Sequence, residues 1–319
     1  MSRAAISPPL AGVLPVVHTP FLEDDSIDWE SLQREVDWAF AQGADGICTG
    51  MVSELLRLTT AERLDLTAGL GEFKRGRGVF VAGIGAESTK QAVEFGRHAT
   101  QCGADAVMAI PPISSALPDD ELLAYFTTIA DEIPVPLIVQ DASSYVGRPI
   151  PFSVCVTLLD RYGPERVLFK PEASPLGPNL SALRDATGRR ARIFEGSGGI
   201  SLVDSFRRGI VGTMPGVEFL PGIVALWRAL QHGDDDAAYR VYFPICALVA
   251  LQLQAGLDGF LAVEKYVLHQ QGLFTTDRRR RPFSWSLDEE TRHEVDRLRQ
   301  ILEAACESTF GRQETGRTL

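Results

Sequence analysis

Lys170 is the residue of this chain whose surroundings best suit covalent chemistry. It is one of only four lysines among 31 basic residues, and it alone follows an apolar run, residues 167–169. Such a run is typical of a strand buried on both faces of a parallel sheet, and Pro171 ends it. A lysine partly removed from water holds its proton less tightly and can attack a carbonyl carbon. Glu172 leaves a second interpretation open, in which Lys170 only caps the strand end and pairs with this carboxylate.

The composition narrows the kinds of partner and cofactor. The formal net charge of −11 argues against a nucleic acid or an anionic membrane as partner, and the run Arg278–Arg281 is interpreted as a solvated loop. The five cysteines are scattered without CxxC spacing, which predicts reduced thiols and a cytoplasmic protein. No metal is expected, because the histidines neither pair as HxxxH nor cluster with carboxylates in the sequence. No cofactor, signal peptide or membrane-spanning stretch is expected either.

Strands and helices alternate along the first two thirds of the chain. Strands are predicted at residues 12–17, within 43–49, and at 78–83, 103–110, 135–141, 167–170, 191–195 and 212–214, each followed by a helical pattern. Eight such units favour a closed (β/α)8 TIM barrel over an open doubly wound sheet. Three further helices are predicted within 234–256, 259–271 and 287–306. The expected organisation is therefore a barrel over residues 1–232 and a C-terminal helical region over 233–319 packed on it.

In such a barrel the chemistry lies at the carboxyl ends of the strands. Lys170 and Glu195 are the candidate catalytic residues. The candidate substrate-binding residues, which follow other strand ends or flank the lysine, are Met51, Val52, Ser53, Glu54, Gln140, Asp141, Glu172, Ser197 and Met214. Gly196-x-Gly198 is a weak dinucleotide signal, and the start of the helix at Gly198 suits either a phosphate group or simple chain geometry.

Several short motifs, in this order and spacing, resemble one family of enzymes. They are Gly12–Pro15, Thr19–Phe21, Gly43–Gly46, the Gly50–Glu54 loop, Pro111–Pro112 and the lysine that ends strand six. Over roughly residues 10–305, the chain is similar to the dihydrodipicolinate synthase / N-acetylneuraminate lyase family of Schiff-base-forming (β/α)8 enzymes. The resemblance implies that Lys170 forms an imine with a 2-oxo acid, that no metal or cofactor takes part, and that the protein is a homo-oligomer, a dimer or tetramer.

Departures from the family pattern bear on the substrate. The usual Gly-Thr-Thr-Gly-Glu loop is here Gly50–Glu54 without the two hydroxyls, although its backbone N–H groups can still hold a carboxylate. The usual Tyr-Asn of strand five, whose tyrosine relays protons, is replaced by Gln140 and Asp141. The arginine that grips a second carboxylate has no match, and Tyr145 falls near its position. Dihydrodipicolinate synthase activity is therefore not expected.

The strand-five and loop motifs are similar to those of the 2-keto-3-deoxy-L-arabonate dehydratases. This similarity implies dehydration of a 2-keto-3-deoxy sugar acid through an imine on Lys170. Glu195, Ser197, Glu172 and an ordered water are the candidates for moving the proton. Two alternatives stay open. One is a retro-aldol lyase or hydratase-aldolase that releases pyruvate, and the other is a non-catalytic paralogue that only binds a 2-oxo acid.

Overall fold

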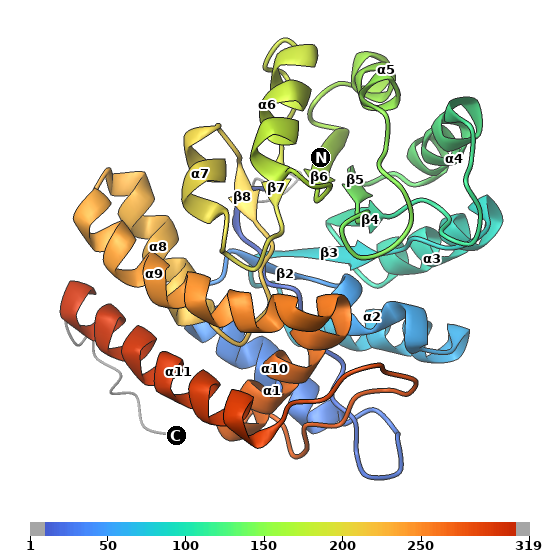
Figure 1. Ribbon diagram of the computed structural model, residues 1–319. Helices are drawn as coiled ribbons and strands as arrows, with labels where there is room; N and C mark the ends of the chain where they lie inside the picture. Colours follow the sequence, from blue (N-terminus) through green and yellow to red (C-terminus); the bar gives the residue numbers. More distant parts are fainter. Residues whose placement is uncertain (1–9, 311–319) are drawn as a thin grey trace, which may run out of the picture.

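In residues 10–310, which the computed structural model describes, eight parallel strands close into a barrel (Figure 1). The strands pair in the orders β2-β3-β4-β5-β6 and β1-β8-β7. Parallel bridges between Val16 and Cys48 and between Phe169 and Ile193 join these two groups into a ring. The predicted TIM-barrel fold is confirmed. The strands are β1 (Gly12–Val13), β2 (Gly46–Cys48), β3 (Val79–Gly83), β4 (Ala106–Ala109), β5 (Leu137–Asp141), β6 (Val167–Pro171), β7 (Phe194–Glu195) and β8 (Gly212–Thr213).

Helices surround the barrel on its outside. Several start where a side chain accepts a hydrogen bond from a free N–H of the first turn, as Asp28 does from Ser31 and Thr59 does from Glu62. The barrel helices are α1 (Trp29–Ala41), α2 (Thr60–Lys74), α3 (Thr89–Gln101), α4 (Asp119–Glu132), α5 (Phe152–Tyr162), α6 (Leu176–Ala186), α7 (Leu202–Arg207) and α8 (Leu220–His232). Short 3-10 turns, η1 (Met51–Ser53) and η2 (Leu55–Arg57), follow β2.

Successive side chains along each strand point alternately into the barrel interior and into the layer between the strands and the helices. Leu168 of β6 and Ile138 of β5 belong to the cluster that fills the barrel interior. Their neighbours Phe169 and Val139 belong to the cluster between strands and helices. Lys170 is two residues beyond Leu168 in β6, so it points toward the barrel axis. The expectation that the aromatic residue before this lysine is core is confirmed, since Phe169 is buried.

Three more helices follow the barrel and cover one side of it. They are α9 (Asp235–Gln252), α10 (Gly256–Gln270) and α11 (Glu289–Phe310), with the 3-10 turn η3 (Leu253–Ala255) between the first two. In Figure 1, α9, α10 and α11 lie together on the side of α8 and α1. The expected boundary after residue 232 falls between α8 and α9. Because α9 packs directly on α8, the division into two domains stays a prediction.

One segment of the C-terminal helices bears on the expectation that no stretch of the chain spans a membrane. The segment Asp235–Gln270 is long and apolar enough to cross a membrane, with a mean hydropathy of 1.6 in its best window. In the fold, η3 breaks this segment into two helices, and half of that window is buried inside the protein. The apolar side chains therefore form core between α8, α9 and α10, which explains their hydropathy without a membrane.

Candidate functional site

Lys170 lies in a pocket at the carboxyl end of the barrel. Its side chain is 4% exposed, and its Nζ is 3.0 Å from Oε1 of Glu172. The free space in the pocket is small, about 40 Å³, and it opens toward solvent at its mouth. It is lined by Val16, Met51, Val52, Gln140, Tyr145, Lys170, Glu172, Gly196, Gly198, Met214, Gly216, Leu257, Phe260 and Glu264. The amine is thus shielded from bulk water but faces a cavity.

Glu172 is held in place from two sides. Its Oε1 pairs with Lys170, and its Oε2 accepts a hydrogen bond of 2.6 Å from Nε2 of Gln140. Burial raises the pKa of the Glu172 carboxyl, and the Lys170 charge and the Gln140 hydrogen bond oppose that rise. A carboxyl with a raised pKa next to an amine is suited to receive and return protons. Gln140 therefore orients the Glu172 carboxyl, and its own amide does not titrate.

The surroundings of Gly196 give a steric reason for one glycine of the stretch that follows β7. A Cβ atom at this position would lie 2.4 Å from Cε of Lys170 and 2.4 Å from Oε1 of Glu172. A larger residue here would therefore displace the end of the Lys170 or Glu172 side chain and disturb their pairing. This steric role of Gly196 needs no bound phosphate or dinucleotide.

The walls of the pocket are largely apolar. Met51 and Val52 from η1 and Met214 after β8 line it, as the sequence predicted for their positions. Tyr145, in the loop after β5, also lines it and packs edge-to-face on Phe260 of α10, with ring centroids 5.8 Å apart. Burial raises the pKa of the Tyr145 phenol, so it stays protonated and can donate a hydrogen bond.

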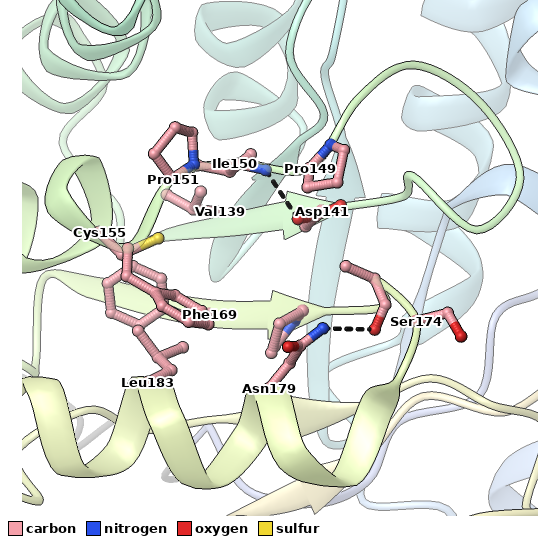
Figure 2. Close-up of a pocket in the computed structure, with 13 residues that line it drawn as sticks. Val139, Asp141, Pro149, Ile150, Pro151, Cys155, Phe169, Ser174, Asn179 and Leu183 are labelled. Atoms are coloured by element: carbon pink, nitrogen blue, oxygen red, sulfur yellow. Dashed lines mark hydrogen bonds between the residues drawn. The ribbon is translucent and has the colours of Figure 1, made fainter.

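Asp141 faces a different cavity, which corrects the prediction that it binds the same substrate. As the neighbour of Gln140 in β5, it points to the opposite side of the barrel wall. Its Oδ2 accepts from the N–H of Ile150 at 2.8 Å and its Oδ1 from that of Ser143 at 3.0 Å. Figure 2 shows it lining an apolar cavity between β5, β6, α5 and α6. Asp141 thus anchors the loop that carries Tyr145.

Glu195 and Ser197 are also turned away from the lysine. Phe194 fills the barrel interior, so the next residue of β7, Glu195, points outward by strand alternation. Its carboxylate accepts hydrogen bonds from the hydroxyl of Thr213 at 2.7 Å and the N–H of Ser197 at 2.6 Å. Ser197 Oγ accepts from the N–H of Ser201 at 2.9 Å. Neither side chain lines the lysine pocket, so the geometry does not support Glu195 as the proton acceptor.

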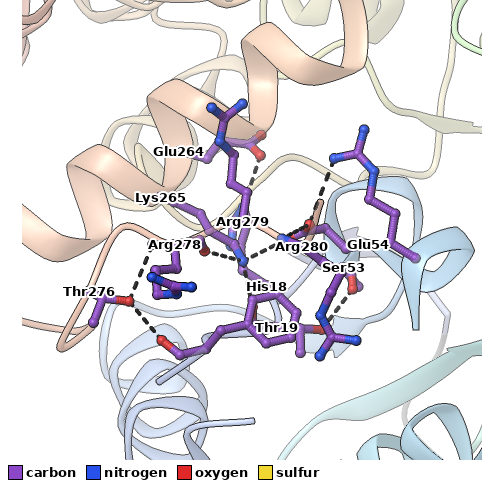
Figure 3. A network of polar contacts seen from close by, with 12 residues as sticks. His18, Thr19, Ser53, Glu54, Glu264, Lys265, Thr276, Arg278, Arg279 and Arg280 are labelled. Atoms are coloured by element: carbon purple, nitrogen blue, oxygen red, sulfur yellow. Dashed lines mark hydrogen bonds and ion pairs between the residues drawn. The ribbon is translucent and has the colours of Figure 1, made fainter. Parts of the chain in front are cut away.

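Ser53 and Glu54 build the loop after β2 rather than contact the cavity. Ser53 Oγ donates to the carbonyl of Val17 and accepts from the N–H of Gly50. Glu54 forms a fully buried ion pair with Lys265 of α10, and its Oε2 accepts from the N–H of Arg280 at 2.8 Å. Figure 3 shows these groups converging from the loop, α10 and the arginine run. These contacts fix the position of η1 relative to the barrel.

The arginine run is not the solvated loop that the sequence predicted. Arg280 has only 14% of its side chain exposed and makes a forked pair with Glu62 of α2, at 2.8 and 3.0 Å. Arg279 stacks on Phe283, and Arg278 accepts a hydrogen bond at its carbonyl from Lys265. The run therefore ties the segment before α11 to the barrel.

A buried polar cluster around His18 lies beside the pocket. His18 Nδ1 is 2.8 Å from Glu35 of α1, and its Nε2 is 3.0 Å from Glu264 of α10. Burial lowers the pKa of His18, but the two carboxylates outweigh it and raise that pKa to about 10. Glu218 is close enough for its ligand atoms to lie within 4.8 Å of those of His18 and Glu264. The expectation that no histidine clusters with carboxylates is therefore wrong for His18.

Relatives of the chain were found by sequence and by structure. The model of the dihydrodipicolinate synthetase family matches residues 9–304. The chain belongs to this family. An L-2-keto-3-deoxyarabonate dehydratase of Azospirillum brasilense is 28% identical over 89% of this chain and 92% of its own length. A 4-hydroxy-tetrahydrodipicolinate synthase of Methanosarcina mazei is also 28% identical, over 75% and 81%.

Solved structures agree with this membership. A dihydrodipicolinate synthase from Rhodopseudomonas palustris superposes with a TM-score of 0.81 at 26% identity, covering 93% of this chain and 99% of that one. A structure from Pseudomonas aeruginosa described as a putative dihydrodipicolinate synthetase reaches a TM-score of 0.84 at 20% identity and covers 92% and 100%. The family resemblance predicted from the short motifs is confirmed.

The buried pair of Glu54 and Lys265 yields a prediction about stability. Glu54→Gln or Lys265→Met alone leaves one buried charge without its partner, so each should lower the free energy of unfolding by about 3–5 kcal/mol. The double variant should lose clearly less than the sum of the two. Urea unfolding of the three variants measures this. Arg97→Met, which breaks the exposed pair with Glu132, is the matched control and should cost about 1 kcal/mol or less. Simple additivity would contradict the buried pairing.

Glu218 yields a prediction about pH. Burial, together with the charge of Glu264, raises its pKa to about 8, from 4.5 for a free glutamate. The folded state therefore favours the protonated form, and this stabilisation is complete below about pH 4.5 and lost as the pH rises through about 8. Glu218→Gln cannot lose a proton, so it should melt close to wild type at pH 5 and above wild type at pH 9. Melting temperatures measured across this range test it, and a constant difference would contradict the shift.

Proposed function

We propose that this protein is a lyase that forms a Schiff base with a 2-oxo acid and removes water from a 2-keto-3-deoxy sugar acid. The observation that carries the proposal is the pairing of Lys170 and Glu172 inside the pocket at the carboxyl end of the barrel. A shielded amine beside a carboxyl group of raised pKa is the arrangement that imine chemistry requires. The relative named L-2-keto-3-deoxyarabonate dehydratase supports this choice of substrate class.

The residues of the pocket suggest an order of events. Lys170 Nζ attacks the C2 ketone, and water leaves to give an iminium ion. The N–H groups of Met51 and Val52, at the free N-terminus of η1, are the proposed partners of the substrate carboxylate. The iminium withdraws electrons from C3, so Glu172 can take a C3 proton. Loss of the C4 hydroxyl as water follows, and hydrolysis frees the product and the amine.

Gln140 argues for elimination rather than for the condensation with a second carboxylated substrate. It occupies the position of the family's proton-relay tyrosine, and its side-chain amide donates a hydrogen bond that orients Glu172. Retro-aldol cleavage shares the first covalent step, so it is the second candidate. The reaction products separate the two, because cleavage releases pyruvate and dehydration gives a 2-oxo semialdehyde. A protein that binds 2-oxo acids without turning any over would be the non-catalytic alternative.

The covalent step can be tested by trapping the imine. Borohydride reduction in the presence of pyruvate should give one stable adduct per chain, which peptide mass mapping assigns to Lys170. The Lys170→Ala variant should give none, while Lys90→Ala, which removes an exposed lysine of α3, should trap normally. A wild-type chain that forms no adduct would refute the Schiff-base mechanism. A panel of 2-keto-3-deoxy sugar acids with product analysis then decides between dehydration and cleavage.

We also propose that the protein acts as a homo-oligomer in the cytoplasm. The five cysteines are all free thiols, which suits a reducing compartment. Phe243 of α9 is 64% exposed beside Tyr239, an apolar group that a subunit contact would cover. Light scattering should give a dimer or tetramer, and Phe243→Glu should shift it toward the monomer. A strictly monomeric wild type would contradict this part of the proposal.

A further inference from the structure

We propose that Glu264 of α10 is a second catalytic acid–base residue, which protonates the departing hydroxyl of the substrate. This inference rests on the proposed dehydration and extends it, since that reaction needs a proton at C4 as well as a proton acceptor at C3. No residue of the barrel strands supplies that second group, because Gln140 replaces the tyrosine and Glu195 points outward. Glu264 comes instead from the helices that follow the barrel.

Glu264 reaches the lysine pocket from the side opposite the barrel strands. It lines the same cavity as Lys170 and Glu172, although its side chain is only 2% exposed. One carboxylate oxygen, Oε2, is 3.0 Å from His18 Nε2. The other oxygen, Oε1, lies beside Gly216 at the cavity wall, where a Cβ atom would come within 2.9 Å of it. One oxygen is thus fixed by the protein and the other is available to a ligand.

His18 holds this carboxylate in a defined orientation. The imidazole is completely buried and is bonded on both nitrogens, to Glu35 at 2.8 Å and to Glu264 at 3.0 Å. The backbone N–H of His18 also donates to Glu35, which fixes the ring in the segment that follows β1. The ring therefore cannot turn away, and Glu264 keeps its second oxygen directed at the cavity. A catalytic group needs such fixed support to act on a particular substrate atom.

Glu218 is the carboxyl group beside Glu264 that can pass a proton to it. Its Oε1 accepts from Nε2 of Gln252 at 2.8 Å, while its Oε2 is buried and has no hydrogen-bond partner among the described residues. Gly216 is the shared neighbour, because a Cβ there would lie 2.1 Å from Glu218 Oε2 and 2.9 Å from Glu264 Oε1. A proton held by one of these two neighbouring carboxyl groups removes the repulsion between their charges.

The charges that face Glu264 come from every element around it. Glu35 (α1) and Glu218 (after β8) are acidic, His18 (after β1) is basic, and Gln252 (α9) is neutral. Lys265, the next residue of α10, forms an ion pair with Glu54, and Lys170 forms one with Glu172. Tyr145 and Phe260 complete the wall. Acidic groups exceed basic ones in this cluster, so holding at least one extra proton lowers its electrostatic free energy.

The reaction balances with two carboxyl groups. Glu172 takes the C3 proton, and the C3–H electrons form the C2–C3 double bond as the iminium nitrogen becomes neutral. The enamine then expels the C4 oxygen, and Glu264 gives that oxygen the proton with which it leaves as water. The substrate loses one water and no redox partner takes part. Glu264 recovers its proton from Glu218 or His18. Glu172 returns its proton to the solvent, and the solvent in turn reprotonates the residue that supplied Glu264.

The removal of the C3 proton and the protonation of the departing hydroxyl can be measured separately. With a 2-keto-3-deoxy sugar acid that wild type dehydrates, Glu264→Gln should still form the borohydride-trapped adduct on Lys170. It should also still exchange the C3 hydrogen with deuterated solvent within about threefold of the wild-type rate, because Glu172 is intact. Its kcat for dehydration should fall by about 10²- to 10⁴-fold. Glu172→Gln should instead lose the C3 exchange. Glu264→Asp should regain part of the activity, and Glu290→Gln on the exposed side of α11 is the control.

Three results would overturn the inference. Dehydration by Glu264→Gln at the wild-type rate would remove any catalytic role. A loss of adduct and C3 exchange in proportion to dehydration would show that Glu264 only maintains the fold. One divalent cation per chain in wild type, measured by mass spectrometry and absent from Glu264→Gln, would make the cluster a metal site instead. If wild type itself forms no adduct, the Schiff-base proposal fails first and this inference fails with it.

Discussion

The pairing of buried charges is the constraint on which the site depends. Ionic groups removed from water are tolerated only when each has a partner at short distance. At the mouth of the barrel this requirement joins Lys170 to Glu172, Lys265 to Glu54, and His18 to both Glu35 and Glu264. Each pair links elements that are distant in the chain or fixes a residue beside the cavity. The same contacts that keep the charges buried therefore also set the geometry of the pocket.

These pairings make α10 part of the site rather than an addition to the barrel. Glu264 and Lys265 are neighbours in this helix, and they reach two different networks. Glu264 meets His18 and the lysine cavity, while Lys265 meets Glu54 and the carbonyl of Thr19. The arginine run after α10 binds the same loop through the contact of Arg280 with Glu54. A change in the packing of the C-terminal helices would thus move both the loop after β2 and the wall of the pocket.

Alternation along the strands decides which polar residues meet the substrate. Gln140 and Lys170 each lie two positions beyond an interior residue of their strand and face the cavity. Asp141 lies three positions beyond Ile138 and Glu195 one beyond Phe194, and these odd offsets turn both side chains outward. Glu172 lies after the end of β6 and returns to the cavity because Gln140 and Lys170 both bind it. Residues next to one another in the sequence therefore have different tasks. Gln140 orients the Glu172 carboxyl, and Asp141 anchors the loop that carries Tyr145.

The sequence by itself determined the barrel, the family and the place of Lys170. These features depend on local patterns, namely apolar runs, alternating strands and helices, and a lysine at a strand end, which are readable from neighbouring residues. The tertiary structure alone decided that Glu264 reaches the lysine pocket and that Lys265, interpreted only as part of a helix, is buried against Glu54. His18 and Glu264 are 246 residues apart, and no local pattern indicates that the C-terminal helices bring them together. Strands of only two residues, such as Phe194–Glu195, are also too short for an alternating pattern in the sequence to show which side chain faces inward.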